Sequence, residues 1–80
     1  MRFLKTIPHH SLSIQLYAWN QKYILKYESG LLEQTYKIPE FEISGEESIE
    51  KLAVATHFIQ TIEKRFEEMW KDLQKMIEEA

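Results

Sequence analysis

The chain contains no cysteine among its 80 residues, so disulfides and thiolate metal ligands are both excluded. A domain of this size buries only about 60% of the surface of its unfolded chain. Small domains therefore often need an additional stabilising element, such as a disulfide, a metal ion or a partner chain, which we call a staple. With disulfides excluded, a second protein chain is the leading candidate for that staple. We expect a homodimer, with a different protein as the alternative partner.

Long apolar runs are also missing. No stretch approaches the ~20 apolar residues that cross a bilayer, and residues 1–5 lack the apolar run of a signal peptide. Two glycines and two prolines are too few for a linker-rich or disordered chain. These features predict one globular domain, residues 1–80, in the cytoplasm and without membrane association.

Charge is unevenly distributed along the chain. Residues 1–39 carry five basic and two acidic side chains, whereas residues 40–80 carry five basic and eleven acidic ones. A basic half beside an acidic half can select partners by charge. Long helices favour Glu and Lys in any case, so helix formation alone explains part of the acidity.

Alternating apolar residues predict three strands, in residues 12–19, 22–28 and 31–38. Residues 1–7 alternate weakly, and whether they form a fourth, edge strand stays open. The dipeptides Asn20-Gln21 and Ser29-Gly30 are plausible two-residue turns. The three strands therefore form an antiparallel meander.

The two turns set registers that give the meander one continuous apolar face. The first turn pairs Leu16 with Leu25 on that face, and the second pairs Lys26 with Glu33 on the opposite face. A slip of one residue would scramble these pairs. The other predicted pairs on the apolar face are Ile14 with Tyr27, Ala18 with Tyr23, Tyr27 with Leu32, and Tyr23 with Tyr36.

A long helix is predicted from residue 44 onward. Ser44 and Glu47 fit a capping box, and no glycine or proline follows before Glu79. The fold class is therefore α+β: a three- to four-stranded antiparallel β-meander (residues 1–43) followed by one long C-terminal amphipathic helix (residues 44–80). The apolar stripe of this helix consists of Leu52, Ile59, Ile62, Phe66, Met69, Trp70, Leu73, Met76 and Ile77.

The predicted helix is longer than the predicted sheet. About 34 helical residues span roughly 50 Å, whereas strands of eight or nine residues reach only about 30 Å. The second half of the helix must therefore extend past the sheet, and exposed apolar patches of this kind mark interfaces. We assign this apolar seam as the dimer interface, whether it pairs with a second helix or exchanges onto the partner's sheet. The seam consists of Phe66, Met69, Trp70, Leu73, Met76 and Ile77.

Few residues suggest catalysis or metal binding. The pair His9-His10 has no third ligand at a recognised spacing, so we interpret it as part of a turn. Glu67 and Glu68 are adjacent, and neighbouring helix residues diverge by about 100° instead of converging on a substrate. No serine has a nearby base or an elbow motif. We predict no catalytic residue, no metal site and no cofactor.

The second face of the sheet combines aromatic and basic residues, which can stack on and follow a single-stranded nucleic acid. In the order of its elements, strands and then one long helix, the chain also resembles the single-stranded-DNA-binding coactivator and Whirly fold, where two β–α units pack with their helices. The residues of this candidate face are Tyr17, Trp19, Lys22, Lys26 and Lys37.

Two functions follow from these patterns. The first is a small non-enzymatic interaction or regulatory protein that acts as a homodimer. The alternative is a single-stranded nucleic-acid-binding protein that uses the outer face of the sheet. We rank it second because the net charge of −3 and the acidic helix oppose phosphate binding.

Overall fold

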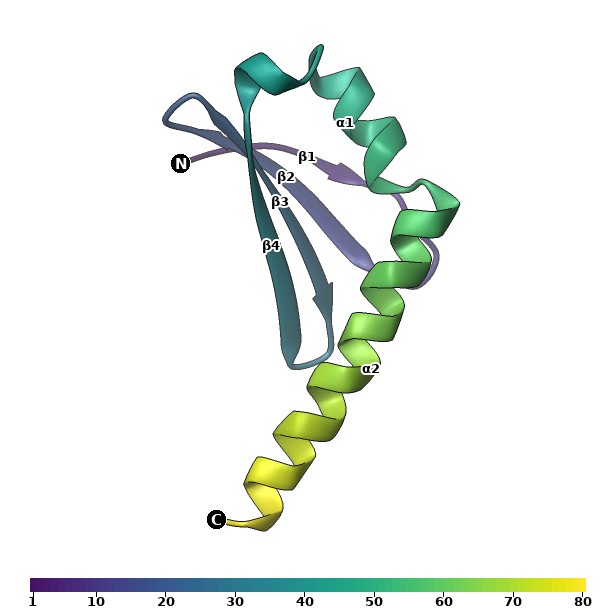
Figure 1. Cartoon of the computed structure of the whole chain (residues 1–80). Coiled ribbons are helices and arrows are strands. Elements are labelled where there is room, and N and C mark those ends of the chain that lie inside the picture. Colours follow the sequence, from purple (N-terminus) through teal and green to yellow (C-terminus); the bar gives the residue numbers. More distant parts are fainter.

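The computed structural model describes all 80 residues as an antiparallel sheet followed by two helices (Figure 1). The strands lie side by side in the order β1-β2-β3-β4, which is their order in the chain. The predicted α+β class and the meander are confirmed, and the N-terminal residues supply a fourth strand. The elements are β1 (Arg2–Ile7), β2 (Ser13–Trp19), β3 (Lys22–Ser29), β4 (Leu32–Pro39), the 3-10 turn η1 (Glu40–Glu42), α1 (Glu46–Ala53) and α2 (Thr56–Glu78).

The turn between β2 and β3 has the predicted position. Asn20 and Gln21 form it with φ angles of 52° and 62°, as a type I′ hairpin turn requires at both central residues. Leu16 consequently pairs with Leu25, as predicted. The predicted pairs Ile14 with Tyr27 and Ala18 with Tyr23 are also present.

The turn between β3 and β4 lies one residue later than predicted, so the predicted pairing of these strands is wrong by two residues. Ser29 belongs to β3 and pairs with Leu32, which leaves Gly30 and Leu31 as the turn. Only Gly30 has a positive φ, 58°, the pattern of a type II′ turn with glycine first. Because the shift is even, each side chain keeps its predicted face. The observed pairs include Tyr27 with Gln34, Tyr23 with Ile38, Leu25 with Tyr36, and Lys26 with Thr35.

A bulge shapes the edge strand β1. The register against β2 shifts between Phe3 and Lys5, so Phe3 pairs with Tyr17 whereas Lys5 pairs with Leu16. The bulge thereby places Lys5 on the side of the sheet that faces the helices. There its Nζ donates a hydrogen bond to Glu50 of α1 at 2.5 Å, which raises the pKa of Lys5. One ion pair therefore ties the edge strand to the first helix.

The C-terminal helical region is divided into two helices, which corrects the prediction of one uninterrupted helix. α1 ends at Ala53 with Val54 as its C-cap, and Ala55 has extended backbone angles (φ −58°, ψ 133°) before α2 begins. The predicted capping box is also wrong. Gly45 occupies the N-cap without a side-chain hydrogen bond, and the Ser44 hydroxyl lies 2.6 Å from the Ser48 hydroxyl.

The core lies between one face of the sheet and the two helices. Two polar side chains of the sheet anchor the helices across it. The Tyr27 hydroxyl donates to the Ala53 carbonyl at 2.7 Å, and Gln34 Nε2 donates to the Ile62 carbonyl at 3.0 Å. The first bond satisfies a carbonyl that the break after α1 leaves without its helical partner. The core cluster consists of Ile7, Leu12, Ile14, Leu16, Leu25, Tyr27, Ile49, Ala53, Ile59, Ile62 and Phe66.

The burial of Tyr27 makes the fold sensitive to alkali. Tyr27 is fully buried, and this burial, followed by the proximity of Tyr36, raises the pKa of its phenol above the ordinary value of 10.0. The unfolded chain therefore loses this proton first as the pH rises. The stability that the neutral phenol contributes is complete below about pH 10 and is lost above it.

We expect the free energy of unfolding to fall above about pH 10 by up to about 1.4 kcal/mol per pH unit from this one group. Tyr27→Phe should flatten that part of the fall, while costing about 1 kcal/mol at neutral pH for the lost hydrogen bond. Urea denaturation of both proteins across this pH range measures the difference. Parallel curves would contradict the assignment to Tyr27.

The molecule is elongated, with principal extents of 44 × 27 × 19 Å. Figure 1 shows the reason, because α2 continues well beyond the β3–β4 turn and the C-terminus lies far from the sheet. Neither helix has the length and apolarity that a bilayer-spanning segment needs. Met69 still packs against the core and Trp70 lies beside the β3–β4 turn, but the C-terminal part of α2 after them extends past the sheet.

Candidate interaction surfaces

The six residues predicted as the seam follow one line along α2 but differ in their surroundings. Phe66 is buried in the core, and Met69 packs against that core. Beyond them Trp70, Met76 and Ile77 are 42%, 62% and 56% exposed. The free part of the seam is therefore its C-terminal part, with Leu73 half-buried between the exposed residues.

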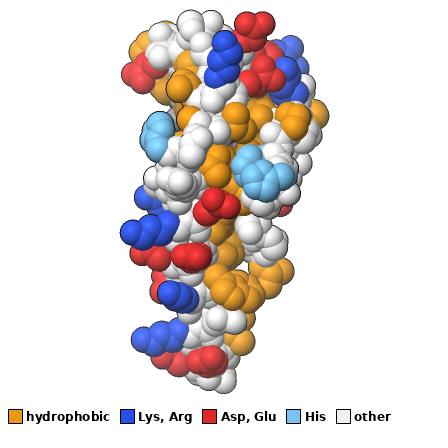
Figure 2. Space-filling view, turned by 90° about the vertical axis from the view of Figure 1, so that its right-hand side faces the viewer, with side chains coloured by type: hydrophobic (Ala, Val, Ile, Leu, Met, Phe, Trp, Pro, Cys, Tyr) orange, Lys and Arg blue, Asp and Glu red, His pale blue; other side chains and the backbone are white.

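Hydrophobic side chains continue from the body of the molecule into its lower part (Figure 2). Because this view is turned about the vertical axis, its lower part corresponds to the second half of α2 in Figure 1. Acidic and basic side chains occupy the other edge of the same region. The second half of α2 is thus amphipathic although it has no sheet to cover.

An apolar groove adjoins the free part of the seam. It has a volume of about 570 Å³ and lies between α2 and the β3–β4 turn. Leu31, which is 79% exposed, forms part of its wall at the tip of the turn. The sequence predicted neither the groove nor the position of Leu31, because both depend on the observed turn at Gly30-Leu31. Five of its ten lining residues are apolar, namely Leu12, Leu31, Leu32, Phe66 and Trp70, and the other five are Ser11, Ser29, Gly30, Glu63 and Glu67.

A second apolar groove of about 320 Å³ opens on the other side of the helix layer, beside the edge strand β4. It exists because α1 and α2 diverge at the break after Ala53, which leaves Ile38 and Phe58 partly uncovered. Leu52, at 58% exposure, stands at its rim. Since the break was not predicted, this groove was not predicted either.

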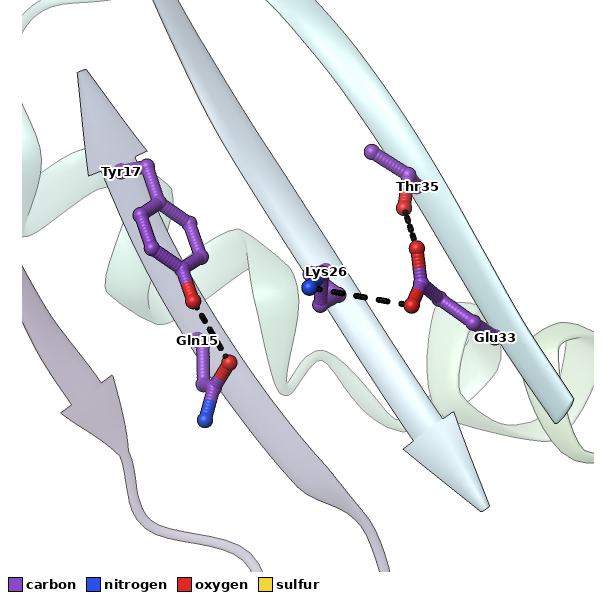
Figure 3. A network of polar contacts seen from close by, with 5 residues as sticks. All are labelled: Gln15, Tyr17, Lys26, Glu33 and Thr35. Atoms are coloured by element: carbon purple, nitrogen blue, oxygen red, sulfur yellow. Dashed lines mark hydrogen bonds and ion pairs between the residues drawn. The ribbon is translucent and has the colours of Figure 1, made fainter. Parts of the chain in front are cut away.

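The outer face of the sheet carries a polar network around Lys26 (Figure 3). Lys26 Nζ lies 3.7 Å from Glu33 Oε1, and the Thr35 hydroxyl donates to Glu33 Oε2 at 2.8 Å. On the other side, the Lys26 ammonium sits 5.6 Å from the centre of the Tyr17 ring. The predicted contact of Lys26 with Glu33 is present, although it runs diagonally because Thr35 is the direct partner.

Of the two aromatic residues predicted for this face, Tyr17 is already engaged within the chain. Its hydroxyl donates to Gln15 Oε1 at 2.9 Å, and its ring meets the edge of Phe3 with 5.4 Å between centroids. Trp19 is 51% exposed and pairs with Lys22 at the end of the strand. Trp19 is therefore the free aromatic surface that remains among the predicted residues.

Phe3 is an aromatic residue of the outer face that sequence reasoning missed. It is 52% exposed and extends the aromatic surface beyond Tyr17 to β1. Its face depends on the bulge before Lys5, for which the sequence gives no signal. Two acidic residues share this face, because Glu28 and Glu33 stand opposite each other beside Lys26. Lys37 lies on the same face, as the partner of Ile24.

The histidine pair has a structural role in the connection between β1 and β2. His9 Nδ1 accepts hydrogen bonds from the backbone N–H groups of Ser11 and Leu12, each at 3.2 Å. The rings of His9 and His10 are stacked, with 4.4 Å between their centroids. The predicted turn is therefore present, with His9 as the side chain that closes it.

Comparisons with family models, curated proteins and solved structures found no match. The function must therefore be argued from the chain's own surfaces. These are the free seam of α2 with its adjoining groove, the groove beside β4, and the aromatic and basic outer face. The first combines three exposed apolar residues, Trp70, Met76 and Ile77, with the larger of the two grooves, and it lies where α2 extends past the sheet.

Proposed function

We propose that this chain is a small non-enzymatic interaction protein of the cytoplasm that acts as a homodimer. The observation that carries the proposal is the apolar stripe of α2, which continues past the end of the sheet as Trp70, Met76 and Ile77. Water-exposed apolar surface of this kind favours association. A second copy of the chain is the simplest partner, because it offers the same surface in return.

The buried polar groups support a structural instead of a catalytic interior. The Tyr27 hydroxyl and the Gln34 amide are each committed to a helix carbonyl, and the Tyr36 hydroxyl donates to Gln34 Oε1 at 2.8 Å. These side chains hold the helices on the sheet. The exposed apolar residues Met76 and Ile77, by contrast, are more than half exposed in the single chain, which leaves most of their surface for contacts with a partner.

Light scattering during size-exclusion chromatography tests the proposal directly. At tens of micromolar protein, we expect about twice the 9.6 kDa chain mass. Because each copy carries a net charge of −3, added salt should hold or strengthen the dimer by screening the repulsion. A folded wild-type monomer at this concentration contradicts the proposal.

Single-stranded nucleic-acid binding is the second candidate function, supported by the exposed ring of Trp19 beside Lys22. In this case affinity for a labelled mixed-sequence oligonucleotide should fall steeply with salt. Trp19→Ala should weaken binding by about 1–3 kcal/mol through lost stacking. Trp70→Phe is the control and should leave binding nearly unchanged, since α2 lies on the other side of the sheet.

The two functions are tested by separate measurements, since salt should hold or strengthen the dimer but weaken oligonucleotide binding. No binding to the oligonucleotide at about 50 mM salt, where phosphate contacts are strong, rejects the second function. Equal binding by wild type and Trp19→Ala would also reject the outer face as the site. Neither result affects the homodimer.

A further inference from the structure

The direction of the free seam defines where a partner can lie. Ile59, Phe66 and Leu73 follow one another at intervals of seven residues, so their side chains point to nearly the same side of α2. Ile59 and Phe66 are buried against the chain's own sheet. Leu73 therefore points toward the space that begins where the sheet ends, beyond the β3–β4 turn (Figure 1).

A parallel partner helix cannot occupy that space. It would bring its own first half, with its sheet, to the height at which this chain's sheet already covers Ile59 and Phe66. In an antiparallel arrangement, only the second halves of the two α2 helices lie side by side. Each first half then keeps its own sheet, and each sheet lies past the end of the other helix. The position of the sheet thus selects the antiparallel orientation.

The groove beside the β3–β4 turn lies where the end of an antiparallel partner helix would arrive. Its walls include Leu31 at the tip of the turn and Trp70 on α2, at the boundary between the sheet and the free seam. Its volume of about 570 Å³ has room for large apolar side chains. The exposed Met76 and Ile77 of the second copy are apolar residues at that distance along the helix.

We propose that two copies of the chain pair through antiparallel second halves of α2, crossing near Leu73, with each helix end in the other copy's groove. This arrangement rests on the proposed homodimer and specifies its geometry. It covers the exposed apolar residues on both sides at once, namely Leu31, Trp70, Met76 and Ile77. It leaves the outer face of each sheet free.

The contact area places the dimer among the smaller stable interfaces. The stretch from Phe66 to Glu79 is about 20 Å long, and the groove adds the tip of the β3–β4 turn. Such a strip reaches the lower end of the range of about 1,200–2,000 Å² for specific interfaces. Association should therefore depend on concentration in the micromolar range, where it can be measured.

Single cysteines test the geometry cleanly, because the chain has no cysteine of its own. In the antiparallel pair, Leu73→Cys places two thiols next to the two-fold axis, so mild oxidation should join the chains. Ile77→Cys should not react with itself, because its two copies lie about 12 Å apart along the axis, beyond the reach of a disulfide. Lys71→Cys lies on the opposite side of the helix, so its rate of disulfide formation gives the background from random collisions between chains.

We expect Leu73→Cys to form the disulfide at least about tenfold faster than Lys71→Cys, since dimerisation raises the local thiol concentration. A mixture of Trp70→Cys and Ile77→Cys chains gives a second, independent measurement. With the crossing at Leu73, residue 70 of one copy lies about 1.5 Å along the axis from residue 77 of the other, so the mixture should form mixed disulfides faster than either variant alone. Light scattering of each reduced variant establishes whether it is still a dimer.

The outcomes separate the geometry from the proposed function. A monomeric wild type overturns both. A dimeric wild type in which Ile77→Cys reacts as fast as Leu73→Cys indicates parallel helices and overturns only the geometry. A dimer in which neither Leu73→Cys nor the mixture reacts faster than Lys71→Cys indicates a different interface, including exchange of α2 onto the partner's sheet, and also overturns the geometry.

Discussion

Leu16→Ala should lower the free energy of unfolding by about 2–4 kcal/mol, because it leaves a cavity in the centre of the core. Leu16 is fully buried and pairs with Leu25 on the face of the sheet that the helices cover. Marginal stability makes this a large share of the total for an 80-residue chain. Urea denaturation followed by circular dichroism measures the loss.

Lys26→Ala is the control on the opposite face. It removes an ion pair with Glu33 and a contact with the Tyr17 ring, both near solvent. We expect a loss below about 1 kcal/mol. Comparable losses for Leu16→Ala and Lys26→Ala would contradict the assignment of the two faces.

Trp70→Asp should convert the dimer into a folded monomer of 9.6 kDa. The substitution places a charge within the proposed interface, in the wall of the groove, where burying it without a partner is strongly unfavourable. Trp70 is 42% exposed within the single chain, so the isolated fold should tolerate the change. Light scattering gives the mass, and circular dichroism shows whether the helices remain.

Phe41→Asp provides the matched control for this experiment. Phe41 is 87% exposed and lies in η1, away from the second half of α2. The same change from aromatic to acidic should leave the mass at about twice that of the chain. A dimer that survives Trp70→Asp, or one that is lost equally with Phe41→Asp, would mean that the seam is not the interface.

Those features of the fold that depend on periodicity could be predicted from the sequence. The alternation of apolar and polar residues was enough to predict the strands and the face of the sheet on which each side chain lies. The register of β2 with β3 followed from the position of the two-residue turn Asn20-Gln21, because the residues on either side of that turn must pair with each other. The extension of the helical region past the sheet followed from lengths alone.

The second register could not be derived with the same certainty, since one glycine fits either position of a two-residue turn. Gly30 stands first in the turn, although the sequence reading placed it second. This difference of one position moves the pairing by two residues. It also decides that Leu31 is exposed at the tip, which is why the groove beside it was missed.

The break between α1 and α2 left no signal in the sequence because no glycine or proline marks it. Tertiary contacts decide it instead. Ile49 and Ile62 are both buried against the sheet, and the Tyr27 hydroxyl takes the place of the helical partner of the Ala53 carbonyl. Val54, Thr56 and His57 are weak helix formers, so local propensity does not oppose the break that packing on the sheet favours.

The order of the strands also determines which contacts lose the most conformational entropy when the chain between them closes into a loop. Each strand pairs with its neighbour in the chain, so every pair in the sheet closes only a short loop. The bonds that fix the helices join much more distant residues, with separations of 26 for Tyr27 to Ala53, 28 for Gln34 to Ile62 and 45 for Lys5 to Glu50. Each hairpin contact therefore loses less loop-closure entropy than a contact between helix and sheet, by about 0.6 kcal/mol for each doubling of the loop length.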